Sequence, residues 1–262
     1  MAPYAAVPVT PRGNASRIFP LKAQSSRAGG RGAIVNQAYA IADDFLSQQD
    51  HLGLWDAFQA SVDSPAGMRE WNRFYQLMDG EDLVTSTFRQ RRPLLRDGTA
   101  NSTSSPAGLR TFSEKLFALM TADRPPLPLD AWTAFSASAW IHRAGSGLAW
   151  HSDTGRVAAY IYYMHPQWRS SWGGELLVAT GGSSSDAAAS RPGDPTDAEQ
   201  VCATGGVFIY PRPNRLVLLR GGTLHCVKNV ERAAGTAIRA SVSGFFFDTA
   251  AGRDETGAGG RT

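Results

Sequence analysis

Two short stretches of this sequence carry side chains that could together hold a metal ion. The first contains His151 and Asp153, two residues apart, and the second contains His225. Because residues two apart in an extended strand point to the same face, His151 and Asp153 would project into one space, and a neighbouring strand could bring His225 beside them. Two imidazoles and one carboxylate occupy one face of an octahedral ion and leave the opposite positions open, as in non-haem Fe(II) oxygenase sites. The pattern predicts such a centre, with O2 and a co-substrate as further ligands.

A His-x-Asp pair arises often by chance, so the alternative is a set of surface polar residues near the edge of a sheet. Three features favour the metal site. Each candidate ligand lies in a segment with the pattern of a strand, the spacing spans several strands, and Arg239 follows His225 after one turn-like stretch. We therefore expect His151, Asp153 and His225 to share one metal ion.

The composition indicates an ordinary globular protein. The chain has 262 residues, of which 42% are hydrophobic, enough for one domain with a real core. A formal net charge of +3 is too small to indicate a nucleic-acid partner or a membrane surface. Only Cys202 and Cys226 are present, and neither a signal peptide nor an apolar run of roughly 20 residues is visible. We expect a cytoplasmic protein without a disulfide framework.

The sequence predicts a single domain between two disordered ends. Residues 1–32 and 250–262 are too poor in apolar side chains to pack, so we expect a mobile lead-in and a tail. The domain covers residues 33–249. Its first part, about 33–128, is predicted to be helical, and the part at about 130–248 consists of short strands.

The helical part contains three amphipathic segments. Apolar spacing between Ile34 and Ala60 predicts a short strand and then a helix, with Asp43 or Asp44 near the helix start. The segments Gly67–Met78 and 107–122 predict two further helices.

Two polar segments could lie over the site. Residues Arg89–Arg96 include four arginines, and we interpret them as a solvated loop, with a clamp for an acidic substrate or a lid as the alternative. Residues 181–205 are rich in Gly, Ser, Ala, Asp and Pro, which predicts an exposed loop that could touch the entrance.

Short strands separated by Gly and Pro dominate the second part. This spacing predicts a mainly β fold with N-terminal helices around a double-stranded β-helix, that is, a jelly-roll or cupin-like core. The predicted strands are Trp132–His142, Leu148–His151, Val157–Met164, Glu175–Thr180, Gly206–Tyr210, Arg215–Leu219, Thr223–Val227 and Ala237–Phe247.

Several motifs in this part resemble the iron(II)/2-oxoglutarate-dependent dioxygenases, in particular the prolyl-hydroxylase-like branch. The motifs, which fall within about residues 132–247, are Gly155–Met164, Gly173–Leu176, Gly222–Val227 and Arg239–Phe246. The resemblance implies Fe(II), 2-oxoglutarate and O2 as cofactor and co-substrates. It also implies that His151, Asp153 and His225 are the iron ligands, as their types and spacing already suggest.

The resemblance further implies that Arg239 pairs with the distal carboxylate of 2-oxoglutarate and that Tyr163 assists it. The planar guanidinium suits this task because it offers two parallel charge-assisted hydrogen bonds. An interior ion pair with Glu175 or Asp248 is the alternative for Arg239. Ser241 lies two positions further along the same strand face and could add a hydroxyl.

The function that we expect is hydroxylation of an unactivated C–H bond in a small metabolite or amino-acid-like substrate, with release of succinate and CO2. One alternative is a hydroxylase of a protein or peptide residue. An alternative of another class is a non-catalytic jelly-roll module that binds a ligand. We expect no nucleic-acid or membrane partner, and the first half of the chain departs from the prolyl-hydroxylase pattern.

Overall fold

The computed structural model describes most of the predicted core and part of the helical region. The described residues are 38–63, 75–76, 83–84, 88–91, 107–129, 131–153, 155–179 and 205–248. The predicted lead-in, residues 181–204 of the predicted loop and the tail lie outside them.

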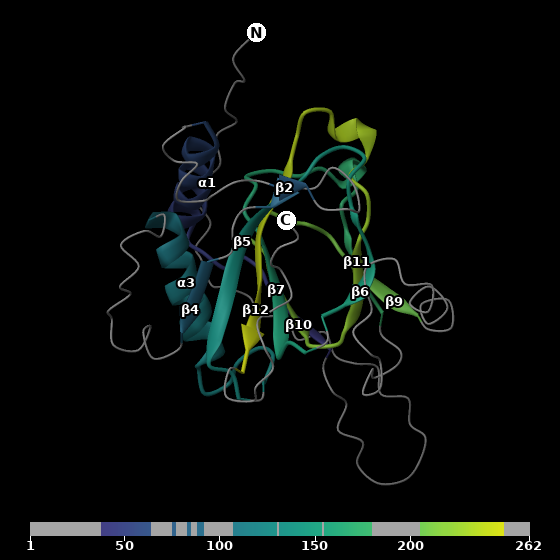
Figure 1. Cartoon of the computed structure of the whole chain (residues 1–262). Coiled ribbons are helices and arrows are strands. Elements are labelled where there is room, and N and C mark those ends of the chain that lie inside the picture. The colour runs from purple at the N-terminus through teal and green to yellow at the C-terminus, as the bar shows by residue number, and fades with distance from the viewer. Residues whose placement is uncertain are drawn as a thin grey trace, which may run out of the picture.

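Two antiparallel sheets face each other (Figure 1). The larger sheet has the strand order β1-β10-β7-β12-β5-β3-β2, with β4 also paired to β5. Its strands are β1 (Tyr39–Ala42), β2 (Tyr75–Gln76), β3 (Leu83–Val84), β4 (Phe88–Arg91), β5 (Ala134–His142), β7 (Ala158–Tyr163), β10 (Leu216–Arg220) and β12 (Arg239–Phe247). The smaller sheet has the order β6-β11-β8-β9, formed by β6 (Leu148–Ser152), β11 (Leu224–Val227), β8 (Leu176–Ala179) and β9 (Gly206–Ile209).

The predicted double-stranded β-helix core is therefore confirmed. All eight predicted strands are present, and their ends shift by no more than two residues. Alternation along β12 shows why the two faces differ. Ala240, Val242 and Phe246 point toward the helices, whereas Arg239 points into the space between the sheets, where the core cluster contains Tyr163 and Val178.

Two helices, α1 (Gln48–Asp63) and α3 (Ala107–Met120), cover one face of the larger sheet (Figure 1). Their buried side chains form one cluster with the sheet, in which the Phe112 ring lies 5.1 Å from the Tyr162 ring. A Cβ on Gly108 of α3 would approach the Leu54 Cα of α1 to 2.7 Å, so the helices pack closely. Within the described residues, no helix is long and apolar enough to cross a membrane.

Helix α1 begins later than predicted, and Ser47 caps it. The Ser47 hydroxyl accepts a hydrogen bond from the Asp50 backbone N–H at 3.1 Å and donates one to the Asp50 carboxylate at 2.6 Å. Asp43 and Asp44 do not mark the helix start as expected. They form ion pairs with arginines of the 210–215 turn instead.

Two further expectations for the first half are contradicted at the residues that the structure describes. Tyr75–Gln76 is a strand, although the helical spacing of 67–78 predicted a helix, and Phe88–Arg91 is a strand paired with β5, although Arg89–Arg96 was interpreted as a loop. The rest of both segments lies outside the described residues. Strand β5 is bonded to β12 along one side only, so its other side offers unpaired backbone groups, which β3 and β4 satisfy. This tertiary pairing outweighs the local sequence pattern.

Candidate active site

Neighbouring strands of the smaller sheet bring the three predicted metal ligands together. His225 of β11 lies directly opposite His151 of β6, and their ring centroids are 4.3 Å apart. The Nε2 atom of His225 lies 3.5 Å from an Asp153 carboxylate oxygen. One ligand atom from each of His151, Asp153 and His225 lies within 4.8 Å of the others. The geometric expectation from the His-x-Asp spacing is thus met.

A β-bulge in β6 shapes this arrangement. His151 pairs with His225 and Leu148 pairs with Val227, so Ala149 and Trp150 together face a single residue of β11. The extra residue lets both Leu148 and His151 point into the space between the sheets.

Backbone carbonyls fix the tautomer of both histidines. The Nδ1 atom of His151 lies 2.8 Å from the Ala149 carbonyl oxygen, and that of His225 lies 2.8 Å from the Thr223 carbonyl oxygen. Because a carbonyl only accepts, each Nδ1 carries the proton and each Nε2 keeps its lone pair. Both lone pairs are then available as metal ligands.

The electrostatics of the cluster favour a bound cation. Burial, with the neighbouring His151, lowers the pKa of His225 below its ordinary value despite the opposing effect of Asp153. The ring is therefore neutral at physiological pH. Two imidazole lone pairs and a carboxylate that converge in a largely buried place repel one another, and a divalent cation relieves that repulsion. The residues present fit a metal ion.

Arg239 is a buried cation at the start of β12. Its side chain is 1% exposed. Nε donates to the Gly174 carbonyl oxygen at 2.8 Å, one terminal nitrogen lies 3.4 Å from His142 Nδ1, and the other lies 3.4 Å from the Tyr163 hydroxyl. None of these three partners is a carboxylate.

Neither carboxylate proposed as a protein partner of Arg239 pairs with it. Among the described residues no Asp or Glu lies within ion-pair distance of Arg239, and Glu175 lies 3.9 Å from Lys228 instead. A buried guanidinium without an anion costs several kcal/mol, on the order of 3 to 5. The site therefore suits an anionic ligand such as a carboxylate.

A pair of glycines, Gly173 and Gly174, allows the Arg239 side chain to lie in this position. Gly173 and Gly174 have φ values of 66° and 73°, a left-handed conformation that favours glycine. A Cβ on Gly174 would lie 2.8 Å from the Arg239 Cδ. The glycine pair itself is visible in the sequence. The hydrogen bond between the Gly174 carbonyl and Arg239 becomes visible only in the folded structure.

Tyr163 and Ser241 lie where their strand positions predicted. Burial raises the pKa of Tyr163 despite the nearby Arg239, so the phenol stays protonated and can donate a hydrogen bond. The hydroxyl oxygens of Ser241 and Ser243 are 3.3 Å apart, on the strand face of β12 that also carries Arg239. Tyr160 and Tyr162 point the other way, into the cluster with the helices.

His165 is a buried side chain that sequence reasoning did not single out. Its Nδ1 lies 3.0 Å from the Ala240 carbonyl oxygen and its Nε2 lies 2.9 Å from that of Pro211. Two facing carbonyls favour a proton on each nitrogen, whereas burial lowers the pKa to about 3. The burial effect dominates because the side chain is 1% exposed and Arg239 is near. A neutral ring carries a single N–H, so His165 donates a hydrogen bond to only one of these two carbonyl oxygens.

Comparison with known families places this site in context. Residues 137–247 match the family model described as the 2OG-Fe(II) oxygenase superfamily. This range contains His151, Asp153, His225 and Arg239. No curated protein sequence matches the chain.

Solved structures share the fold. A prolyl hydroxylase from Trichoplax adhaerens, in complex with a peptide fragment of the hypoxia inducible factor oxygen degradation domain, superposes with a TM-score of 0.53 at 17% identity, over 81% of this chain and 84% of its own. EctD from S. alaskensis in its apoform gives a TM-score of 0.50 at 13% identity, over 82% of this chain and 74% of its own.

Proposed function

We propose that this chain, whose residues 137–247 form a domain of the 2OG-Fe(II) oxygenase superfamily, hydroxylates an unactivated C–H bond of a small metabolite or amino-acid-like substrate. Enzymes of this superfamily use Fe(II), 2-oxoglutarate and O2, which when bound supply the oxidising power for inserting oxygen into a C–H bond, with release of succinate and CO2.

One observation carries the proposal. The two facing sheets present a cluster of two imidazoles and a carboxylate together with a buried guanidinium that has no carboxylate partner among the described residues. A cation site and an anion site inside the same barrel suit a metal ion with an anionic co-substrate. The chemistry of these donors supports the proposal independently of the family match.

His151, Asp153 and His225 would hold the metal ion. The Nδ1 contacts with Ala149 and Thr223 orient the two rings, and the Nε2 atom of His225 faces the Asp153 carboxylate. Three protein ligands leave the remaining positions of an octahedral ion to small molecules.

Arg239, Tyr163 and Ser241 would bind the far carboxylate of 2-oxoglutarate. Arg239 offers two terminal nitrogens, and Tyr163 offers a protonated hydroxyl beside one of them. Ser241 is 1% exposed and lies on the same strand face. These groups fix the position and direction of the co-substrate and exclude water from its charged end.

The strand face that follows the arginine supports a small substrate. Beyond Arg239, the inward positions of β12 are Ser241, Ser243 and then Phe245, whose ring lies 5.3 Å from the Arg156 guanidinium carbon. Beyond the Ser241 hydroxyl, which is assigned to the co-substrate, the Ser243 hydroxyl and the Phe245 ring suit a compact ligand with a polar group. The runner-up is a residue of a peptide, because the Trichoplax adhaerens structure with the same fold holds a peptide fragment.

A coupled turnover assay separates these possibilities. The protein is incubated with Fe(II), 2-oxoglutarate and O2, and succinate release is compared across free amino acids, other small metabolites and proline-containing peptides. We expect a small molecule to raise succinate release above the substrate-free rate. If only peptides raise succinate release, the substrate is a peptide residue rather than a small molecule. If no succinate is released under any condition, the proposed activity is contradicted.

A further inference from the structure

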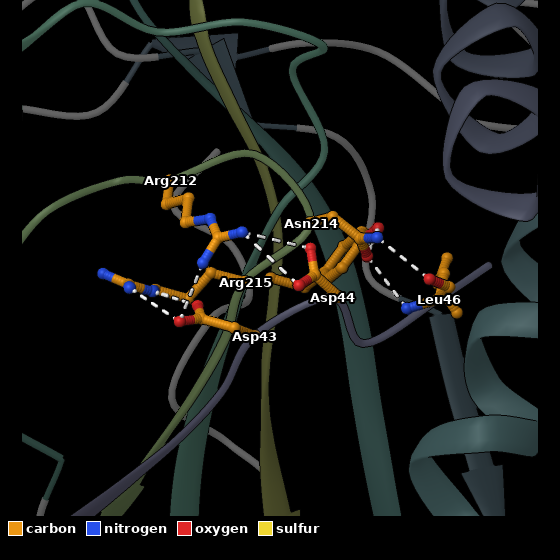
Figure 2. Close-up of polar contacts among 7 residues, drawn as sticks. Asp43, Asp44, Leu46, Arg212, Asn214 and Arg215 are labelled. Atoms are coloured by element: carbon orange, nitrogen blue, oxygen red, sulfur yellow. Dashed lines mark hydrogen bonds and ion pairs between the residues drawn. The ribbon is translucent and has the colours of Figure 1, made fainter. Parts of the chain in front are cut away.

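A polar cluster joins the segment before α1 to the turn before β10. It contains Asp43, Asp44 and Leu46 on one side and Arg212, Asn214 and Arg215 on the other, and Figure 2 shows the two sides in contact. This cluster lies outside the metal and co-substrate sites, but its backbone reaches Tyr163.

The turn holds the backbone of Tyr163 on both sides. The Tyr163 N–H donates to the Arg215 carbonyl oxygen at 3.0 Å, and the Asn214 N–H donates to the Tyr163 carbonyl oxygen at 2.9 Å. Tyr163 also lies at the end of β7, where Ser241 of β12 is its last partner in the ladder. The direction of the Tyr163 ring therefore depends on where the turn lies.

The Asn214 side chain fixes the turn. Its Oδ1 accepts hydrogen bonds from the Leu46 N–H at 2.8 Å and from the Tyr162 hydroxyl at 3.0 Å, and its Nδ2 donates to the Leu46 carbonyl oxygen at 2.9 Å. If the amide were flipped, its nitrogen would face the Leu46 N–H and its oxygen would face the Leu46 carbonyl oxygen. Only one orientation of the Asn214 amide therefore makes both hydrogen bonds. Asn214 has a φ of 60°, a conformation that few residues other than glycine adopt.

An ion pair adds to the same restraint. Arg215 Nε and its terminal nitrogen contact the two Asp43 carboxylate oxygens at 2.6 and 3.0 Å, and Arg215 also donates to the Tyr210 carbonyl oxygen. Burial tends to raise the pKa of Asp43, but the hydrogen bond and charge of Arg215, with Arg212, outweigh it and lower the pKa. The carboxylate thus stays charged.

We infer that Asn214, supported by the Asp43–Arg215 pair, is a positioning residue for the 2-oxoglutarate contact made by Tyr163. The inference rests on the proposed function, because Tyr163 is a co-substrate contact only in that function. Asn214 touches neither metal nor co-substrate and acts through the backbone of Tyr163.

The test measures 2-oxoglutarate binding to the Fe(II)-loaded protein without oxygen by titration calorimetry, together with KM, kcat and Tm. Asn214→Gly keeps the backbone conformation and removes all three side-chain contacts. We expect its dissociation constant and KM for 2-oxoglutarate to rise about fivefold, the equivalent of one misaligned neutral hydrogen bond, while kcat at saturation changes less than about twofold.

Two control variants separate positioning from stability. Asp44→Asn removes an exposed ion pair of the same cluster and should leave 2-oxoglutarate affinity and Tm unchanged. Leu116→Ala, in the buried cluster under α3, should lower Tm without changing that affinity. Asp43→Asn weakens the ion pair that supports Asn214 and leaves the three Asn214 contacts in place, so a smaller rise of about twofold is expected, and it replaces Asn214→Gly if that variant does not fold.

A double variant completes the test. In a Tyr163→Phe background, Asn214→Gly should weaken 2-oxoglutarate binding no further, since coupled residues are not additive. Full additivity, or unchanged affinity in Asn214→Gly and Asp43→Asn with only Tm lowered, would overturn the inference and leave the proposed function standing. Absence of 2-oxoglutarate binding by the unmodified protein would overturn both.

Discussion

Arg239 shows how one residue can link fold and chemistry. It is fully enclosed, and its hydrogen bonds go to a backbone carbonyl, an imidazole and a phenol rather than to a carboxylate. Such an environment keeps a guanidinium charged and leaves its charge unneutralised until an anion binds. In the proposed function, Arg239 is therefore the residue that pairs with the co-substrate carboxylate.

Replacement of Arg239 should weaken 2-oxoglutarate far more than iron. Arg239→Lys keeps the charge but loses the bidentate geometry, and Arg239→Ala loses both. Loss of a desolvated charge-assisted contact costs on the order of 2 to 5 kcal/mol, or roughly 30-fold to several-thousand-fold in affinity. Calorimetric titration of 2-oxoglutarate measures whether its affinity falls in the order wild type, Arg239→Lys, Arg239→Ala. Wild-type affinity in Arg239→Ala would make Arg239 a purely structural residue.

Gly174→Ala should affect both stability and co-substrate binding. The new Cβ meets Arg239 Cδ and also strains a left-handed backbone, which costs roughly 1–2 kcal/mol. Gly235→Ala is a matched control, because Gly235 has a φ of 59° and a Cβ there would meet nothing within 4 Å. We expect urea unfolding to show both variants destabilised, and only Gly174→Ala to have a raised KM for 2-oxoglutarate. Equal KM values for 2-oxoglutarate in Gly174→Ala and Gly235→Ala would show that the contact between a Cβ at position 174 and Arg239 does not affect co-substrate binding.

At the scale of elements, His51 links α1 to β7. Its Nδ1 lies 2.6 Å from the Tyr162 hydroxyl, and burial lowers the pKa of the ring from 6.5 to about 4. The unfolded chain therefore binds a proton below pH 6.5 that the folded chain does not. This contribution to stability is complete above pH 6.5 and is lost as the pH falls toward 4.

His51→Asn should make stability less dependent on pH. Relative to the variant, the wild type is expected to lose about 1.4 kcal/mol of unfolding free energy per pH unit below pH 6.5. Urea unfolding of both proteins from pH 7.5 to 4.5 measures this difference. Parallel curves would mean that His51 is protonated in the folded state.

Local patterns predicted some elements and not others. Each of the eight predicted strands, such as Arg215–Leu219, which the structure shows as Leu216–Arg220, carries its own run of apolar residues between turn residues, so the local sequence was sufficient to predict it. The strand Phe88–Arg91 forms because it pairs with the side of β5 that β12 leaves open. A short segment of sequence contains no information about that pairing. Likewise, Ser47 rather than Asp43 begins α1 because Asp43 is taken by Arg215, 172 residues away.

The same distinction holds for the site. His151 and Asp153 share a face because of strand periodicity, and that is visible in the sequence. The Gly174 carbonyl and the Asn214 amide act through contacts with residues 65 and 168 positions away, so only the fold reveals them.

At the scale of the whole molecule, the site needs both sheets. The candidate metal ligands lie on or next to the smaller sheet, while Arg239, Tyr163 and Ser241 belong to the larger sheet. Side chains such as Ile161, Val178 and Leu219 pack between the sheets and keep the two halves of the site together. A ligand that spans both halves binds only the folded chain and therefore stabilises it.

Thermal unfolding should report this link. Without oxygen, Fe(II) and 2-oxoglutarate together are expected to raise Tm more than Fe(II) alone, and ligand at 100 times its dissociation constant stabilises by about 2.7 kcal/mol. Succinate serves as the control for carboxylate binding in general. An unchanged Tm at saturating concentrations would show that the ligands do not join the two sheets.

The most direct test of the proposed oxygenase site is an anaerobic titration of 2-oxoglutarate into the Fe(II)-loaded protein, followed by metal-to-ligand charge-transfer absorbance. We expect a saturable, stoichiometric band in the wild type, because a carboxylate held by Arg239 brings the other end of 2-oxoglutarate to the metal. The band should be absent in His225→Ala, which removes one Nε2 ligand from the cluster. No band in the wild type, or an equal band in His225→Ala, would contradict the assignment of this site.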